Sequence, residues 1–338
     1  MRKAGLRLNS IFVILAAMLL LVSGGSVWAA PEYTMKLGHA TANDAQDEVA
    51  KLFAKEVEQL SKGRIKATVY NASTLGNNQK MNIDVRSGAQ EALEQPAGYA
   101  VPYIPILGVL DLPFLFPNPA VQTKVLMNNE ATAPFLEAHR KLGLEVVSIF
   151  SGGFKYFATK FPLKTFEDMK GRKLRVIQSP ELVEQIKAFG AIGIPLALSE
   201  SYTAIQQGVV EGVELPIDVI QHLRFHEVAK YLASIQHGTL TTYIVVNKRW
   251  LDSLPKDLQE AVRQAGRLTS AEALKIYTQF QQNSQDVMKK GGAIYTEIPE
   301  SERAKFKAAG EKVWEEIRKD KAKAETLNPL VKAIQEAK

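Results

Sequence analysis

The pattern of apolar residues between positions 35 and 69 constrains the fold most. Residues 35–37 are predicted to form a short strand that ends at Gly38-His39, and residues 65–69 alternate apolar and polar side chains, as a strand does. Between them, apolar residues recur at helical spacing, namely Val49, Leu52, Phe53, Val57 and Leu60. Two strands joined through a helix usually pair in parallel, so the pattern predicts an α/β fold around an open sheet.

The length of the chain indicates more than one lobe. The sequence has 338 residues, of which 46% are hydrophobic and 23% are charged, as in globular proteins. A chain of this length exceeds what one core usually supports, which favours two lobes. There is no cysteine, so disulfides, thiolate nucleophiles and cysteine metal ligands are excluded.

Residues 1–29 have the features of a secretory signal. Arg2, Lys3 and Arg7 precede the apolar run 11–22, and Val27-Trp28-Ala29 offers small residues for cleavage after Ala29. A membrane anchor is the alternative, but the run is shorter than the ~20 residues that span a bilayer. The sequence thus predicts export, with no stable membrane insertion of the remaining chain.

The charge balance gives little sign of a nucleic-acid partner. The formal charge is +6, and the predicted signal carries three of these positive charges without any acid. No basic stripe interleaved with aromatic residues follows. We therefore predict no nucleic-acid binding.

The rest of the chain continues the α/β pattern. A strand over residues 145–150 runs into Ser151-Gly152-Gly153, after which a second lobe is expected to begin. Ser179-Pro180-Glu181 is a typical helix start. Residues 255–290 have an unusually long helical pattern, which could brace both lobes, and the tail after Ile298 is amphipathic. Residues 96–119 are expected to form a buried, irregular connection.

Motifs of enzymes and metal sites are missing. The sequence has no G-x-S-x-G, H-E-x-x-H, G-x-x-x-x-G-K or G-x-G-x-x-G stretch. His222 and His226 stand four apart on a predicted helix, but a third ligand is not signalled, and a solvated helix face is the favoured interpretation. We predict no catalytic residue, no metal and no cofactor.

Arg175 is the strongest candidate binding residue. It lies between Leu174, Val176 and Ile177 on a strand that should be buried. A buried guanidinium requires an anionic partner. That partner is either a carboxylate of the protein or the carboxylate of a bound ligand, and the helix start at Ser179 favours anions as well.

Several stretches then resemble a known family. The sequence is similar to periplasmic solute-binding proteins of TRAP transporters, of the DctP type, over nearly the whole chain after the signal. The stretches that carry the resemblance are Leu37-Gly-His39, Gly63-Arg-Ile-Lys66, Thr74-Leu-Gly76, Leu110-Asp-Leu-Pro-Phe-Leu-Phe116, Gly171-Arg-Lys-Leu-Arg-Val176 and Tyr202-Thr-Ala-Ile-Gln-Gln-Gly-Val-Val-Glu-Gly212.

The resemblance implies a set of ligand-binding residues. Arg175 would hold the ligand carboxylate in a two-pronged salt bridge, and Lys155 stands where the family usually has a second arginine. Leu215 replaces the family's usual asparagine, which implies a ligand with fewer hydroxyl groups at that end. Glu94 holds a family pocket position that contacts polar ligand groups. Further candidates are Glu214, Gln178 and Tyr99.

The resemblance also implies architecture and partners. The fold would be a two-lobed α/β binding protein of the type II, Venus flytrap kind. Lobe I would take residues 30–152 plus about 241–281, and lobe II residues 153–240 plus about 282–338. Its function would be to capture a small organic acid, such as a dicarboxylate, and deliver it to TRAP membrane permease subunits. The alternatives are a carboxylate receptor for another transporter or sensor, and a periplasmic enzyme acting on a carboxylate.

Overall fold

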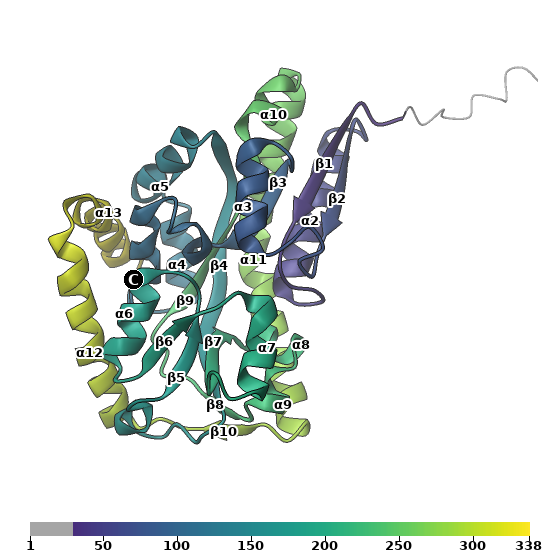
Figure 1. The fold of residues 1–338 in the computed structure, drawn as a ribbon. Coiled ribbons are helices and arrows are strands. Elements are labelled where there is room, and N and C mark those ends of the chain that lie inside the picture. The colour runs from purple at the N-terminus through teal and green to yellow at the C-terminus, as the bar shows by residue number, and fades with distance from the viewer. Residues whose placement is uncertain (1–29) are drawn as a thin grey trace, which may run out of the picture.

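The computed structural model describes residues 30–338, so the predicted signal peptide 1–29 lies outside the described residues. Figure 1 shows two lobes, one above the other, in contact with each other. Across the described residues, none of the helices combines the length and the apolar character needed to cross a membrane. The two-lobed α/β architecture predicted from the sequence is confirmed.

The first lobe contains the predicted strand–helix–strand unit. Its sheet has the order β2-β1-β3-β9-β4, with β1 parallel to β2 and β3, and with β9 antiparallel to β3 and β4. The strands and helices of this lobe are β1 (Tyr33–Gly38), α2 (Ala45–Leu60), β2 (Ile65–Tyr70), α3 (Asn78–Ser87), β3 (Ala92–Pro96), α4 (Pro119–Leu126), α5 (Asn129–Lys141), β9 (Thr239–Asn247) and α10 (Lys248–Ser253).

The connection between β3 and α4 is mostly buried, as predicted. It contains the short 3-10 segments η1 (Ala97–Ala100) and η2 (Pro105–Asp111). Their apolar side chains join the core under α4 and α5, so this irregular segment is part of the packed interior.

Strand β4 (Leu144–Thr159) belongs to both lobes. Its first part pairs with β9, and from Lys155 onward it pairs with β7 (Gly212–Pro216). The predicted strand end at Phe150 was wrong, because a bulge between Ser151 and Phe154 absorbs the two glycines, with Gly153 at φ +79°. The chain therefore enters the second lobe without leaving the strand.

The second lobe has a sheet of its own. Strand β5 (Lys173–Val176) lies parallel between β6 (Ile192–Pro195) and β7, and β8 (Tyr231–Ala233) pairs with β4 and β10 (Ile294–Thr296). The helices of this part are η3 (Phe166–Met169), α6 (Pro180–Ala188), α7 (Leu198–Gln206), α8 (Ile217–His222) and α9 (Phe225–Val228).

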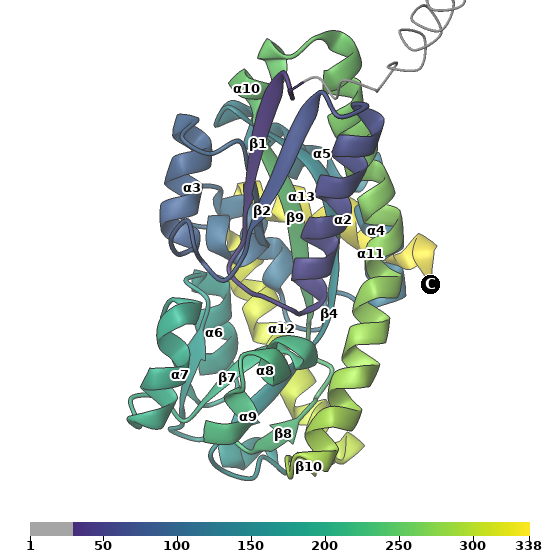
Figure 2. The ribbon, with the colours of Figure 1, turned by 90° about the vertical axis from the view of Figure 1, so that its right-hand side faces the viewer.

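Helix α11 (Lys256–Lys290) confirms the predicted long helix. It packs against α2 and β4 in the first lobe and against α8 in the second, and Figure 2 shows it running along both. Gly266 permits the close approach to β4, because a Cβ atom there would collide with the Val147 carbonyl group. The helix is thus fixed to the strand that joins the lobes.

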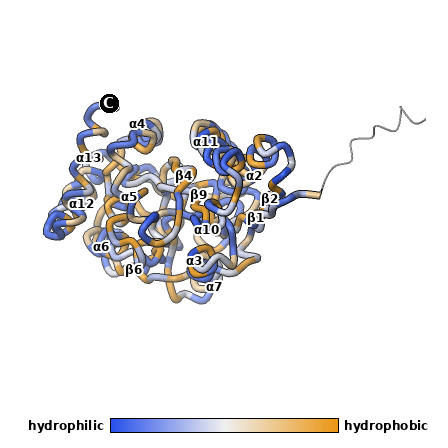
Figure 3. The backbone as a smooth tube through the Cα atoms, turned by 90° about the horizontal axis from the view of Figure 1, so that it is seen from above, coloured by the Kyte–Doolittle hydropathy of each residue, from blue (hydrophilic) through white to orange (hydrophobic). Residues whose placement is uncertain are grey.

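The C-terminal tail divides between the lobes. Helix α12 (Glu300–Lys319) packs on α6, whereas α13 (Lys321–Ala337) packs on α4, α5 and η2. The expected lobe boundaries stay a prediction, although these contacts associate α13 with first-lobe elements. Seen from above, the central strands β4 and β9 are largely apolar, while α11 and α12 present hydrophilic turns outward (Figure 3).

Candidate functional site

Arg175 is fully buried, and its partners are not anions. Its Nε donates a hydrogen bond to the Leu196 carbonyl at 3.0 Å, and its Nη2 donates to the Tyr99 hydroxyl at 2.8 Å. Its Nη1 has no hydrogen-bond partner among the described residues. A buried guanidinium with a free nitrogen and no compensating carboxylate is a strong site for an external anion.

The register of the sheet determines which side chains share a face with Arg175. Its neighbours Leu174 and Val176 point into the core under α6, so Arg175 points to the opposite face. Arg175 pairs with Val213, and Leu215 lies two residues further along the same strand. Leu215 is buried, with 5% of its surface exposed. The apolar Leu215 therefore lies on the sheet face to which Arg175 points, as a residue lining a ligand there would.

Two predicted residues join the lobes beside Arg175. Tyr99, on η1 of the first lobe, is the hydroxyl partner of Arg175 in the second lobe. Gln178, which follows β5, accepts a hydrogen bond from Gln79 on α3. Arg175 with Tyr99, and Gln178 with Gln79, therefore each form a contact between the lobes.

Lys155 and Glu214 lie on the other face of the second-lobe sheet. Phe157 pairs with Glu214, and Lys155 lies two residues before Phe157 on β4. The Lys155 ammonium group lies 2.7 Å from the Glu214 carboxylate, and both side chains are buried. Each of the two charges therefore neutralises the other. The predicted contacts of Lys155 and Glu214 with a ligand stay predictions.

Two residues that were not among the predicted binding residues complete this ion pair. The His237 ring contacts the Glu214 carboxylate, and Gln185 donates to it at 3.0 Å. Burial by itself would raise the pKa of Glu214, but the Lys155 ammonium and the His237 ring hold that pKa far below its usual value. Glu214 is therefore an ionised carboxylate in the interior, and Lys155, His237 and Gln185 all contact its Oε1.

Glu94 lies in a second buried group of polar side chains. It is fully buried on β3, and neither carboxylate oxygen has a hydrogen-bond partner in residues 30–338. Burial, reinforced by the nearby Asp44 and Asp47 carboxylates, raises the pKa of Glu94 well above its usual value. Sequence reasoning identified Glu94 but missed Asp44, which comes from a different element.

The predicted helix carrying both His222 and His226 is wrong. His222 ends α8, and Arg224 takes up a left-handed conformation with φ +59° before α9 begins at Phe225. The two rings are therefore not on one helix face. Within the described part of the chain, no group of three or more His, Asp or Glu side chains is arranged to hold a metal ion.

Asp111 gives the fold a measurable pH dependence. Burial raises its pKa to about 7, although the Lys155 ammonium partly opposes the shift. The folded protein keeps this proton up to about pH 7, whereas the unfolded chain releases it near pH 4, so the contribution of Asp111 to stability falls as the pH rises between these values. We expect Asp111→Asn to gain stability relative to the wild type by on the order of a few kcal/mol between pH 5 and pH 8. Denaturant unfolding of both proteins at the two pH values measures this, and an unchanged difference would contradict it.

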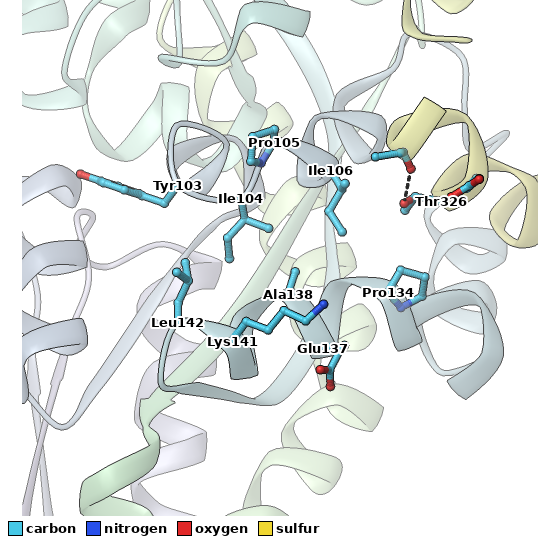
Figure 4. A pocket seen from close by; sticks show the side chains of 12 residues that line it. Tyr103, Ile104, Pro105, Ile106, Pro134, Glu137, Ala138, Lys141, Leu142 and Thr326 are labelled. Atoms are coloured by element: carbon cyan, nitrogen blue, oxygen red, sulfur yellow. Dashed lines mark hydrogen bonds between the residues drawn. The ribbon is translucent and has the colours of Figure 1, made fainter. Parts of the chain in front are cut away.

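The surface also carries an open groove away from Arg175. It has a volume of about 570 Å³ and lies between η2, α5 and α13 (Figure 4). Its walls combine apolar side chains such as Ile104 and Leu142 with the exposed charges of Glu137 and Lys141. None of the candidate binding residues lines this groove, so it is separate from the site around Arg175.

Comparisons with known proteins agree with this geometry. Residues 37–321 match the family model DctP, described as bacterial extracellular solute-binding protein, family 7. The 2,3-diketo-L-gulonate-binding periplasmic protein YiaO of Escherichia coli is 28% identical over 89% of this chain and 92% of its own. A sugar acid binding protein from Advenella mimigardefordensis, solved with galactonate, is 26% identical, with a TM-score of 0.86 over 90% of this chain and 98% of its own.

A TRAP periplasmic solute-binding protein from Desulfovibrio salexigens, solved with orotic acid, is also similar. It is 29% identical, with a TM-score of 0.81 over 90% of this chain and 98% of its own. The resemblance inferred from the motifs is thereby confirmed over most of the sequence. The chain belongs to the DctP family of bacterial extracellular solute-binding proteins, which bind small organic acids and work with TRAP permeases.

Proposed function

We propose that this protein is a periplasmic receptor that captures a small organic acid between its lobes and delivers it to TRAP permease subunits. The observation that carries the proposal is the buried Arg175, which retains an unpaired Nη1 and has no carboxylate partner within the described residues. A planar guanidinium in this state suits a carboxylate with two parallel oxygens.

The surrounding residues have distinct parts in this proposal. The Leu196 carbonyl and the Tyr99 hydroxyl fix the guanidinium plane, so that little conformational freedom is lost when the acid binds. Gln178 and Tyr99 tie the two lobes together around the bound acid. Lys155 and Glu214 pair with each other on the other face of the sheet, and we propose no chemical step on the ligand.

The similar proteins support an acid as the ligand. Their names and structures give 2,3-diketo-L-gulonate, galactonate and orotic acid as ligands. These molecules differ in size and hydroxyl content but share an acidic group. Arg175 would bind the acidic group that they share, while other residues of the site would determine which size and hydroxyl content are accepted.

A thermal-shift screen tests the proposal. The probes are succinate, galactonate, orotate and a library of other carboxylates, each beside its neutral amide. At least one acid should raise the melting temperature by several degrees and its amide should not, because binding to the native state stabilises it. If no acid has an effect, or if amides act equally, the proposed function is wrong.

Leu215 should determine how well a hydroxylated acid is accepted. Leu215→Asn introduces donors on the face of Arg175, and we expect it to improve the affinity for galactonate over that for hexanoate by about 10-fold, the value of one hydrogen bond. Calorimetry measures the ratio. Leu215→Met keeps the volume without a hydrogen bond and should leave the ratio unchanged; an equal change in both variants would contradict the assignment.

A further inference from the structure

We propose that Asp44, Glu94, Asp218 and Tyr277 form a second subsite, which receives a hydrogen-bond-donating group at the end of the ligand remote from its carboxylate. This inference rests on the proposed function, since it divides the bound acid between Arg175 and this subsite. It predicts an acid whose far end bears a hydroxyl or an ammonium group, and not a second carboxylate.

The subsite is assembled from four elements. Asp44 is the N-cap of α2, Glu94 lies on β3, Asp218 lies on α8 and Tyr277 lies on α11. All four side chains are buried, with at most 2% of the surface exposed. Ala45, which follows Asp44, packs in one apolar cluster with Tyr277 and with Ala92 and Ile244, the neighbours of Glu94 in the sheet. The Ala45 backbone N–H also donates to Asp218, so the four groups lie near one another.

Polar atoms at this position remain unused. Asp44 Oδ1 accepts from Thr41 and from the Asp47 backbone, but Asp44 Oδ2 has no partner in the part of the chain that the structure describes. The same is true of Asp218 Oδ1 and the Tyr277 hydroxyl, and of both oxygens of Glu94. Buried polar atoms cost free energy unless they are paired, so five such atoms at one position indicate a missing polar partner.

A neighbouring carboxylate shows what a structural role looks like. Asp47 is equally buried, but it is bonded to the His39 ring, the Asn43 backbone N–H, the Lys51 ammonium and the Asn71 amide. These partners hold the pKa of Asp47 far below its usual value in spite of its burial. Both oxygens of Asp47 are therefore paired, whereas one oxygen of Asp44, one of Asp218 and both of Glu94 have no partner among the described residues.

The chemistry of the group determines what it can accept. Three carboxyl groups without a buried cation repel a carboxylate and attract N–H or O–H donors. Burial raises the pKa of Asp218 to about 7, with Asp44 as the next cause. A hydroxyl group can pair with neutral or ionised carboxyl groups, and an ammonium group would favour their ionised form.

The subsite is complete only when the lobes meet, as at Arg175. Asp44, on the first lobe, and Asp218, on the second, are joined through the Ala45 backbone N–H, which donates to Asp218 Oδ2 at 3.2 Å. Helix α8 follows directly on β7, and β7 carries Val213 beside Arg175. One strand and its following helix thus connect the two subsites within the second lobe.

A matched series of acids tests the inference. The probes have three to eight carbons and end, opposite the carboxylate, in a methyl, hydroxyl, ammonium or second carboxylate group. At the best length, calorimetry should show the hydroxy or amino acid binding at least about 10-fold more tightly than the methyl and dicarboxylate members. Whichever of the hydroxy and amino acids binds more tightly shows whether the subsite receives a hydroxyl or an ammonium group.

Variants assign the effect to the subsite. In Asp44→Asn and Asp218→Asn the amide oxygen keeps the bonds to the protein's own donors, and an NH2 group replaces the unpaired oxygen. Each variant should therefore weaken the donor-bearing acid by about 10-fold and leave the methyl-ended acid unchanged. Asp320→Asn, at the exposed N-cap of α13, is the matched control and should change neither.

The outcomes separate this inference from the proposed function. If the methyl-ended or dicarboxylate member binds as tightly as the donor-bearing one, and still needs Arg175, the subsite is wrong and the receptor function stands. If no member of the series or of the carboxylate library binds, both are wrong.

Discussion

Replacing Arg175 by alanine should abolish the binding of the acid found in the screen. The guanidinium supplies two charge-assisted hydrogen bonds to a carboxylate, each worth about 1.5–3 kcal/mol, and no other buried cation within residues 30–338 is seen to share its face of the sheet. We expect the affinity to fall at least about 100-fold. Titration calorimetry on the purified protein measures the loss.

Two further variants separate binding from folding at this position. Arg175→Met keeps most of the buried volume and should lose binding as alanine does, with a smaller loss of stability. Arg175→Lys keeps the charge but not the planar fork and should bind weakly. Arg267→Ala removes an exposed arginine paired with Glu260 and should bind normally. An unchanged affinity in Arg175→Ala would refute the assigned role.

Replacing Glu214 by glutamine should cause a large loss of stability even without ligand. The substitution leaves the Lys155 ammonium in the interior without its carboxylate partner. Breaking one side of a buried ion pair typically costs about 3–5 kcal/mol. Denaturant unfolding at neutral pH measures the change in the free energy of unfolding.

Removing both charges should be milder than removing one. The double variant Lys155→Met, Glu214→Gln no longer buries an unpaired charge, and we expect it to recover much of the loss. Glu184→Gln breaks the exposed Lys187–Glu184 pair and should cost less than about 1 kcal/mol. If Glu214→Gln were as mild as Glu184→Gln, the Lys155–Glu214 pair would not be a buried structural unit.

Local patterns were enough to predict that Arg175 is buried and to predict much of the architecture. Arg175 stands among apolar neighbours on a short strand, and that placement alone indicated a buried cation in need of an anion. The long helix was predicted because a helical pattern, which includes Leu258, Val262 and Tyr277, extends up to the pair Gly291-Gly292. Both features depend on neighbours in the sequence, which a single sequence records.

Features that depend on distant segments could not be predicted in this way. Asp44 and Asp218 are ordinary helix-start residues in the sequence, and they become buried because the lobes pack together. Lys155 was expected to face the ligand, but its partner Glu214 comes from another strand. The amphipathic pattern of the tail did not reveal which elements it covers, and Phe306 and Leu330 are completely buried against segments distant in the sequence.

Two continuous segments, β4 and α11, run through both halves of the molecule, and the chain crosses a third time between β8 and β9. A bulge marks β4 where it passes from one half to the other. Several chain connections between two lobes permit hinge closure, but they oppose sliding or twisting of one lobe against the other. Each closure of the lobes would then bring Tyr99 to the same position relative to Arg175. The lobes would therefore close in the same relative orientation each time. The proposed permease would then contact the same surface whenever a ligand is bound.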